Sequence, residues 1–247
     1  MDDLKDFHVN RVFVEGELVA EEGKYLPEIK KCDIASVKGS VIVKDFSKEK
    51  FKMHLKSNKV NVIQILPGGV VTAKDIAEIE LDANGEFVRN PEVDLVKVAV
   101  VERHQGTGNV ACGFLKGYGI KEGAVALSVA HDSHNIIVVG VNDDEMEFAV
   151  NSLVEQEGGI VLVKEGKVIE SMPMPIAGLM SDQSGEWVDQ KLTDIHEKAY
   201  EELGICGDVE PVMTLCFMSL AVIPEIKLTD MGLFDVTTFS FIPVEAE

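Results

Sequence analysis

Residues 128–144 read SVAHDSHNIIVVGVNDD and place a polar cluster between two apolar segments. These segments, residues 124–129 and 136–141, are rich in β-branched side chains, which predicts a buried strand, a polar loop and a second buried strand. A buried polar group without a hydrogen-bond partner costs about 1–3 kcal/mol, so the cluster is a candidate functional site. We define the polar loop as His131, Asp132, Ser133, His134 and Asn135.

The residue types in the polar loop allow three interpretations. His131 and His134 are three residues apart and would both bind a metal ion if further ligands came from elsewhere in the chain. Alternatively, the five side chains recognise a polar heterocycle or orient a catalytic water. In a purely structural interpretation, Asp132 and Ser133 bond to the amides of a turn and the histidines bond to backbone carbonyls. The residues alone leave all three open.

Composition bounds the class of protein. The chain has 247 residues, of which 46% are hydrophobic and 27% are charged. These values are typical of a globular protein with one large domain, or one large and one small domain. The net charge of −20 disfavours nucleic acids and anionic membranes as partners, because both attract basic surfaces.

Further features of the sequence favour a cytoplasmic protein. The four cysteines form no CxxC pair, which favours a reduced protein over a disulfide scaffold. The first ten residues, MDDLKDFHVN, lack the apolar segment of a signal peptide. The longest apolar run, residues 212–223, is too short for a membrane-spanning helix.

Residues 1–40 are predicted to be a small β piece and not an independent domain. Residues 11–20, RVFVEGELVA, predict a hairpin with its turn at Glu15 and Gly16. A single hairpin cannot bury a core. We therefore expect residues 1–40 to be the remnant of a larger β-domain and residues 41–247 to form a second domain.

Residues 41–247 predict many strands and two helices. Apolar residues at helical spacing over residues 142–157 predict a helix capped by Asn142, and Ser184 is expected to cap a second helix that ends at Gly204. Residues 172–182 are expected to form an irregular loop. The remaining predicted elements are strands at 52–55, 59–66, 93–101, 124–129, 136–141, 212–222 and 236–242, and hairpins at 70–88 and 160–170. The fold class that follows is α+β (mixed α/β), with a strand-rich mixed sheet covered by helices.

Other candidate residues lie outside the polar loop. Arg103 and His104 follow the strand predicted at 93–101, and ligand sites gather at such strand ends. Arg103 would either clamp a ligand carboxylate or form a surface pair with Glu102. The segment GTGN at 106–109 is only weakly similar to a phosphate-binding loop, because the Lys-Ser/Thr end of that motif is missing. Asp182 ends an apolar loop, as a helix cap or a turn residue would.

Four segments carry a resemblance to a known family. They are ERHQGTGN at 102–109, GFLKGYGIKEGAVALSVAHDSHNIIVVG at 113–140, PIAGLMSD at 175–182 and PEIKLTDMGLFDV at 224–236. Together they closely resemble the C-terminal region of bacterial-type adenine deaminases, which belong to the amidohydrolase superfamily. The resemblance extends over residues 9–244. The hairpin at 11–20 is similar to strands that follow the catalytic barrel in these enzymes and complete a small β-domain.

The resemblance implies a hydrolytic reaction, in which a metal-activated hydroxide converts adenine to hypoxanthine and ammonia. It also implies an N-terminal (β/α)₈ barrel, in which an HxH pair, further histidines and an aspartate hold two divalent metal ions, manganese or iron. This chain contains no HxH. We therefore expect it to bind no metal itself and to need the barrel as its partner. An expressed C-terminal portion, a natural split subunit and a stand-alone relative without catalysis remain open as explanations.

The resemblance also ranks the candidate site residues. The polar loop is expected to reach the purine site, where it closes over the substrate or fixes its ring nitrogens. Arg103 and His104 are the second candidates and Asp182 is the third. An open sheet edge beside an absent domain predicts self-association into a homo-oligomer. Two other functions remain: a non-catalytic ligand-binding or oligomerisation module derived from the enzyme, and a small hydrolase that uses His131, Asp132 and His134 with one metal.

Overall fold

The computed structural model describes residues 3–246, and the chain divides into two compact units, Met1–Ser36 and Val37–Glu247. The first unit is a three-stranded antiparallel sheet of β1 (Arg11–Val14), β2 (Glu17–Glu21) and β3 (Lys24–Tyr25). The predicted hairpin is confirmed, and its turn residues Glu15 and Gly16 both have positive φ. None of the described residues of this unit is buried.

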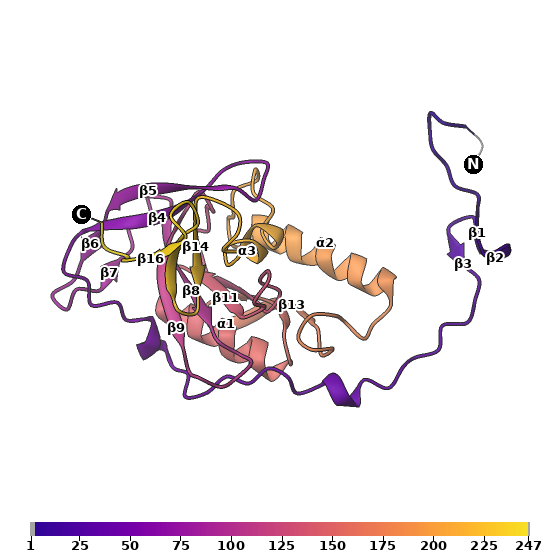
Figure 1. Ribbon diagram of the computed structural model, residues 1–247, viewed down its shortest axis with the longest axis horizontal. Helices are drawn as coiled ribbons and strands as arrows, with labels where there is room; N and C mark the ends of the chain where they lie inside the picture. The colour runs from indigo at the N-terminus through magenta and orange to yellow at the C-terminus, as the bar shows by residue number, and fades with distance from the viewer. Residues whose placement is uncertain (1–2, 247) are drawn as a thin grey trace. The chain divides into compact units, whose positions relative to one another are not determined.

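The second unit is built on an eight-stranded sheet (Figure 1). The pair β4–β9 is parallel and the other neighbouring pairs are antiparallel, so the sheet is mixed. In spatial order the strands are β13 (Lys167–Pro173), β12 (Gly159–Lys164), β10 (Ala124–Leu127), β11 (Ile136–Gly140), β8 (Leu95–Val101), β9 (Val110–Lys116), β4 (Lys59–Ile65) and β5 (Thr72–Glu78).

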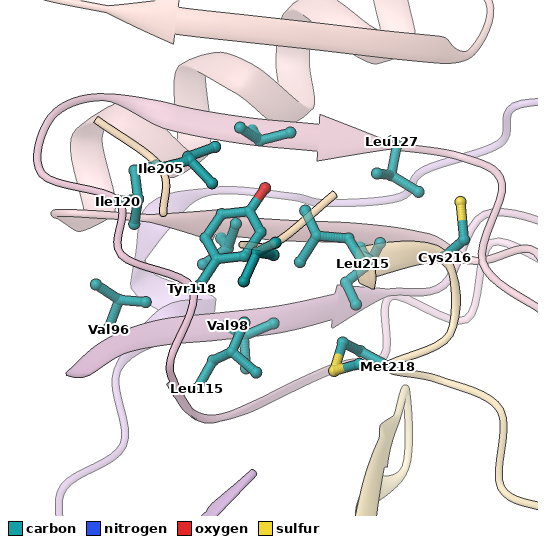
Figure 2. Packing of buried hydrophobic residues seen from close by; sticks show 14 of the residues in the cluster. Val96, Val98, Leu115, Tyr118, Ile120, Leu127, Ile205, Leu215, Cys216 and Met218 are labelled. Atoms are coloured by element: carbon teal, nitrogen blue, oxygen red, sulfur yellow. The ribbon is translucent and has the colours of Figure 1, made fainter. Parts of the chain in front are cut away.

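Both faces of the central strands are buried, because alternate residues enter two different hydrophobic clusters. Val125 and Ile137 face one cluster, which also contains residues of α2 (Gly185–Glu201) and the short helix α3 (Met213–Cys216). Figure 2 shows part of this cluster, including Leu127 of β10 and Leu215 of α3. Ala126 and Val138 face the other cluster, against α1 (Asp143–Glu155). The predicted strand-rich mixed sheet covered by helices is confirmed.

Smaller elements surround this sheet. They are the 3₁₀ turns η1 (Ala35–Val37) and η2 (Lys48–Phe51), the two-stranded sheet of β6 (Glu80–Leu81) and β7 (Phe87–Val88), and the three-stranded sheet of β14 (Ile226–Thr229), β15 (Gly232–Asp235) and β16 (Ser240–Ile242). Within residues 3–246, none of the helices has the length and apolar character that crossing a membrane requires.

Several predicted elements are wrong, and each error has a physical reason. Residues 212–222 form α3 and turns where a strand was predicted, because a short apolar run between prolines does not distinguish buried strand from buried helix. Residues 52–55 form no strand. Strand β9 was missed because glycines surround it. The hairpin of β14 and β15 was not predicted, and only Ser240–Ile242 of the strand predicted at 236–242 is extended.

The predicted cap of α1 is confirmed and supports a stability test. The side-chain oxygen of Asn142 accepts a hydrogen bond from the Glu145 amide at 2.8 Å. Replacing an N-cap by alanine removes this acceptor, so Asn142→Ala should lower the free energy of unfolding by about 1 kcal/mol, as measured by urea denaturation. Asn151→Ala, at an exposed position within the same helix, is the control and should cause no loss. Equal losses in both variants would contradict the cap assignment.

Candidate functional site

The polar loop joins β10 to β11 and is held through its backbone. The His131 amide donates to the Cys216 carbonyl at 2.8 Å, and the His134 amide donates to the Ala130 carbonyl at 2.5 Å. His134 has a φ of +51°, which closes a tight turn between strands that pair directly. The loop is therefore anchored both to its own base and to the end of α3.

Arg103 follows β8 and contacts the polar loop. Its side chain is almost fully buried, with 1% exposed. Nε donates to the His134 carbonyl at 2.5 Å, and Nη2 donates to the carbonyls of Ser128 at 3.4 Å and Ala177 at 3.2 Å. The alternative of a surface pair with Glu102 is wrong, because Arg103 is buried and its side chain donates to backbone carbonyls. The guanidinium therefore holds the backbone of the polar loop at His134.

Glu102 is also buried, and it is satisfied by a different part of the backbone. Its carboxylate accepts hydrogen bonds from the amides of His104, Gln105 and Thr107 at 2.6–2.9 Å, and from the Thr107 hydroxyl at 3.1 Å. Burial alone would raise the pKa of Glu102, but these amide donors outweigh it and lower the pKa to about 2. The Thr107 amide, which lies in the GTGN segment at 106–109, thus already donates to a carboxylate.

Three further contacts connect the polar loop with its surroundings. A ring nitrogen of His104 lies 2.7 Å from the Ser133 carbonyl oxygen. Asn135, which is buried, accepts from the Arg103 amide at 3.3 Å and donates to Asp230 at 3.2 Å. Asn109 donates to the other carboxylate oxygen of Asp230 at 3.4 Å. Asp230 was not among the predicted site residues, although it lies in the segment at 224–236 that carries part of the family resemblance.

The histidine side chains of the polar loop form a small ring cluster with Phe217. The ring centroids of His131 and His134 are 5.5 Å apart, and those of His131 and Phe217 are 4.9 Å apart. Nδ1 of His134 is buried and has no hydrogen-bond partner within the described chain. Burial, His131 and Arg103 together lower the pKa of His134 from its usual 6.5. The imidazole of His134 is therefore neutral at pH 7.

The structure does not join Asp182 to the polar loop. The carboxylate of Asp182 accepts a hydrogen bond from the side-chain amide of the neighbouring Gln183 at 2.8 Å. The segment that precedes it does approach the site, because Ala177 accepts from Arg103. The structure thus brings together His104, Arg103 and the polar loop, whereas Asp182 precedes Ser184, the cap of α2, by two residues.

Comparison with known proteins identifies the family. A family model described as the adenine deaminase C-terminal domain matches residues 69–240. The chain belongs to this family. The match includes the polar loop, Arg103, His104 and Asp230, so the whole cluster of contacts described above lies within the adenine deaminase C-terminal domain.

Curated relatives of this domain include longer proteins. A protein named adenine deaminase 2 from Desulfotalea psychrophila is 65% identical over 246 residues, which cover 100% of this chain and 43% of the relative. Adenine deaminase from Ligilactobacillus salivarius is 47% identical, over 99% of this chain and 42% of the relative, and adenine deaminase 2 from Carboxydothermus hydrogenoformans is 44% identical, over 98% and 42%. The chain spans about two fifths of the length of these relatives.

The potential metal-ligating side chains among the described residues do not fit a pair of metal ions. Among residues 3–246, no group of three or more histidine, cysteine, aspartate or glutamate side chains is arranged to hold a metal ion. His131 and His134 lie close together, but a metal site needs at least a third protein ligand. The metal-binding interpretation of the polar loop therefore lacks its required ligands in the described chain.

The low pKa of Glu102 leads to a pH-dependent prediction. Because the pKa is about 2 in the folded state and ordinarily 4.5, the stabilisation is complete above about pH 4.5 and is lost as the pH falls towards 2. Glu102→Gln places an amide donor against amide donors and should lower the free energy of unfolding by about 1–3 kcal/mol at pH 7. Urea denaturation at a series of pH values should show this difference shrinking below pH 4.5.

The matched control for this variant is Glu92→Gln, at an exposed glutamate. It should change stability little at any pH. A loss for Glu102→Gln that stays constant down to pH 2 would show that the charge of Glu102 is not what stabilises the segment after β8.

Proposed function

We propose that this domain acts as the C-terminal part of an adenine deaminase, in which the polar loop helps to form or close the purine site. The enzyme would convert adenine and water to hypoxanthine and ammonia. The family membership and the names of the longer relatives support this proposal. The observation that carries it is the state of the polar loop, whose backbone is held by hydrogen bonds while Nδ1 of His134 has no hydrogen-bond partner among the described residues.

The side chains of the loop are suited to a polar heterocycle. Asp132 and Ser133 are exposed, and their side chains make no hydrogen bond within the described chain. Nδ1 of His134 is buried without a partner, and native proteins leave few such atoms unbonded unless a ligand or water completes them. A neutral imidazole and a carboxylate offer both donor and acceptor positions, which match the alternating ring nitrogens and amine of adenine.

The proposal divides the enzyme between two parts. We propose that the metal pair, manganese or iron, lies in a barrel domain that this chain does not contain. When bound, such metals supply a hydroxide nucleophile. The domain described here contributes substrate contacts and excludes water from the purine site. The first unit exposes apolar side chains such as Phe13, which is 59% exposed, and this supports its role as a remnant of a larger β-domain. Assembly into a homo-oligomer stays a prediction.

Complementation tests the proposed function. Adenine turnover is measured for this chain alone and for this chain mixed with the barrel-containing remainder of the Desulfotalea psychrophila protein, with manganese or ferrous iron present. Activity is expected only in the mixture. In the mixture, His131→Ala and Asp132→Ala should lower kcat/KM by about tenfold or more, because each removes a group that faces the purine. His54→Ala, at an exposed histidine paired with Glu86, should leave kcat/KM unchanged.

Other outcomes select the other functions. If neither sample turns over adenine but the chain binds it, the domain is a ligand-binding module. If neither turnover nor binding is found and the chain forms a stable dimer, it is an oligomerisation module. Turnover by the chain alone, lost in His131→Ala, would make the polar loop the centre of an independent hydrolase.

A further inference from the structure

Arg103 connects the polar loop to a second segment, residues 174–180. In this segment the amides of Leu179 and Met180 donate to the Ile176 carbonyl, which forms a compact turn. Nη2 of Arg103 donates to Ala177 within the turn, while Nε donates to His134 in the polar loop. One guanidinium thus bonds to two loops that are more than 40 residues apart in the sequence.

Gly178 lies directly against this guanidinium. A Cβ atom added to Gly178 would lie 2.9 Å from Nη1 of Arg103, and Gly178 has a φ of +71°. The hydroxyl of Ser128 donates to the Gly178 carbonyl at 2.6 Å and accepts from the Gly159 amide at 2.7 Å. The turn is therefore packed directly against the guanidinium, and Ser128, which follows β10, connects it to the first residue of β12.

Among residues 3–246, Arg103 forms no ion pair with a carboxylate, although the charge of the adjacent Glu102 acts to raise the pKa of the guanidinium. The carboxylate of its neighbour Glu102 accepts from amides of the following segment. Burying an arginine charge is costly unless several hydrogen bonds satisfy it. Its fork of five N–H donors suits three separate carbonyl oxygens in a way that the single ammonium of a lysine does not.

We propose that Arg103 is a positioning residue that couples the polar loop to the turn at residues 176–180, so that both hold their ligand-facing geometry together. This inference rests on the proposed function, because it assigns both loops to the same purine-facing surface. Met180 is 58% exposed on the turn. Arg103 acts on the substrate through these loops and does not contact it.

Hydrogen exchange on this chain tests the coupling without any enzyme assay. Arg103→Lys keeps the charge but removes the fork. We expect it to speed exchange of the amides of His131 and His134 and of Leu179 and Met180, by about tenfold in both segments. Gly178→Ala displaces the guanidinium from the other side and should produce the same paired change. Because both variants break one connection, their effects should not add in the double variant.

Two control variants separate coupling from general damage. Lys227→Met replaces another buried cation, one that donates to the Val70 carbonyl at 3.0 Å. Gly166→Ala introduces a side chain at a similar φ of +66° where no atom lies within 4 Å. Both should leave exchange in the two segments unchanged. Faster exchange in one segment only, or in all variants alike, would overturn the proposal.

The complemented enzyme provides a second measurement. A loosened site must be ordered when adenine binds, so Arg103→Lys should raise KM by about tenfold with kcat within about twofold. A merely structural role would lower the amount of active enzyme and hence kcat, with KM unchanged. If hydrogen exchange changes in both segments but the complemented enzyme with the unchanged chain shows no adenine turnover, the coupling stands and the proposed function fails. If turnover is present and KM is unaffected, the positioning role is excluded while the proposed function stands.

Discussion

The burial of both faces of the central strands is the constraint on which the rest of the structure depends. Alternate residues of β8, β10 and β11 enter one hydrophobic cluster or the other, so a polar side chain within these strands must find a partner inside the protein. Lys97 does so with the Phe51 carbonyl and Asp143. Polar groups without such partners can lie only where the strands end. The Val101–Ile136 pair brings the end of β8 beside the start of β11, which is where the candidate site lies.

Two adjacent buried charges, Glu102 and Arg103, organise this strand end through the backbone. The Glu102 carboxylate accepts hydrogen bonds from backbone amides of the segment that follows it. The Arg103 guanidinium donates hydrogen bonds to backbone carbonyls of two other loops. Hydrogen bonds to charged groups are stronger than those between neutral groups. Both charges thus fix loops without using the side chains of His131, Asp132 and Ser133, which remain available to a ligand.

The two units of the chain differ in how completely they bury their apolar side chains. The second unit buries two extensive hydrophobic clusters and a smaller one. The described part of the first unit buries no residue, and side chains such as Phe13 and Ile29 are largely exposed. Exposed apolar surface of this kind usually marks a contact with another part of a protein. This contrast supports the proposed division of the enzyme into parts that are complete only together.

The sequence by itself determined the features that depend on neighbouring residues. The polar loop between two buried strands, the Asn142 cap of α1, the Ser184 cap of α2 and the Glu-Gly turns all follow from patterns within a few residues, because capping and turn formation act over that range. The family resemblance, from four motifs, is likewise confirmed by the family model.

Only the tertiary structure decided how these parts meet. The bond between Asn135 and Asp230 joins residues 95 positions apart, and the bond between Arg103 and Ala177 joins residues 74 apart. Such contacts leave no trace in local periodicity. For the same reason the apolar run at 212–222 was predicted as a strand, since its burial was evident but its backbone conformation was set by packing against the sheet. The role of Arg103 as a buried link between two loops is visible only once the chain is folded.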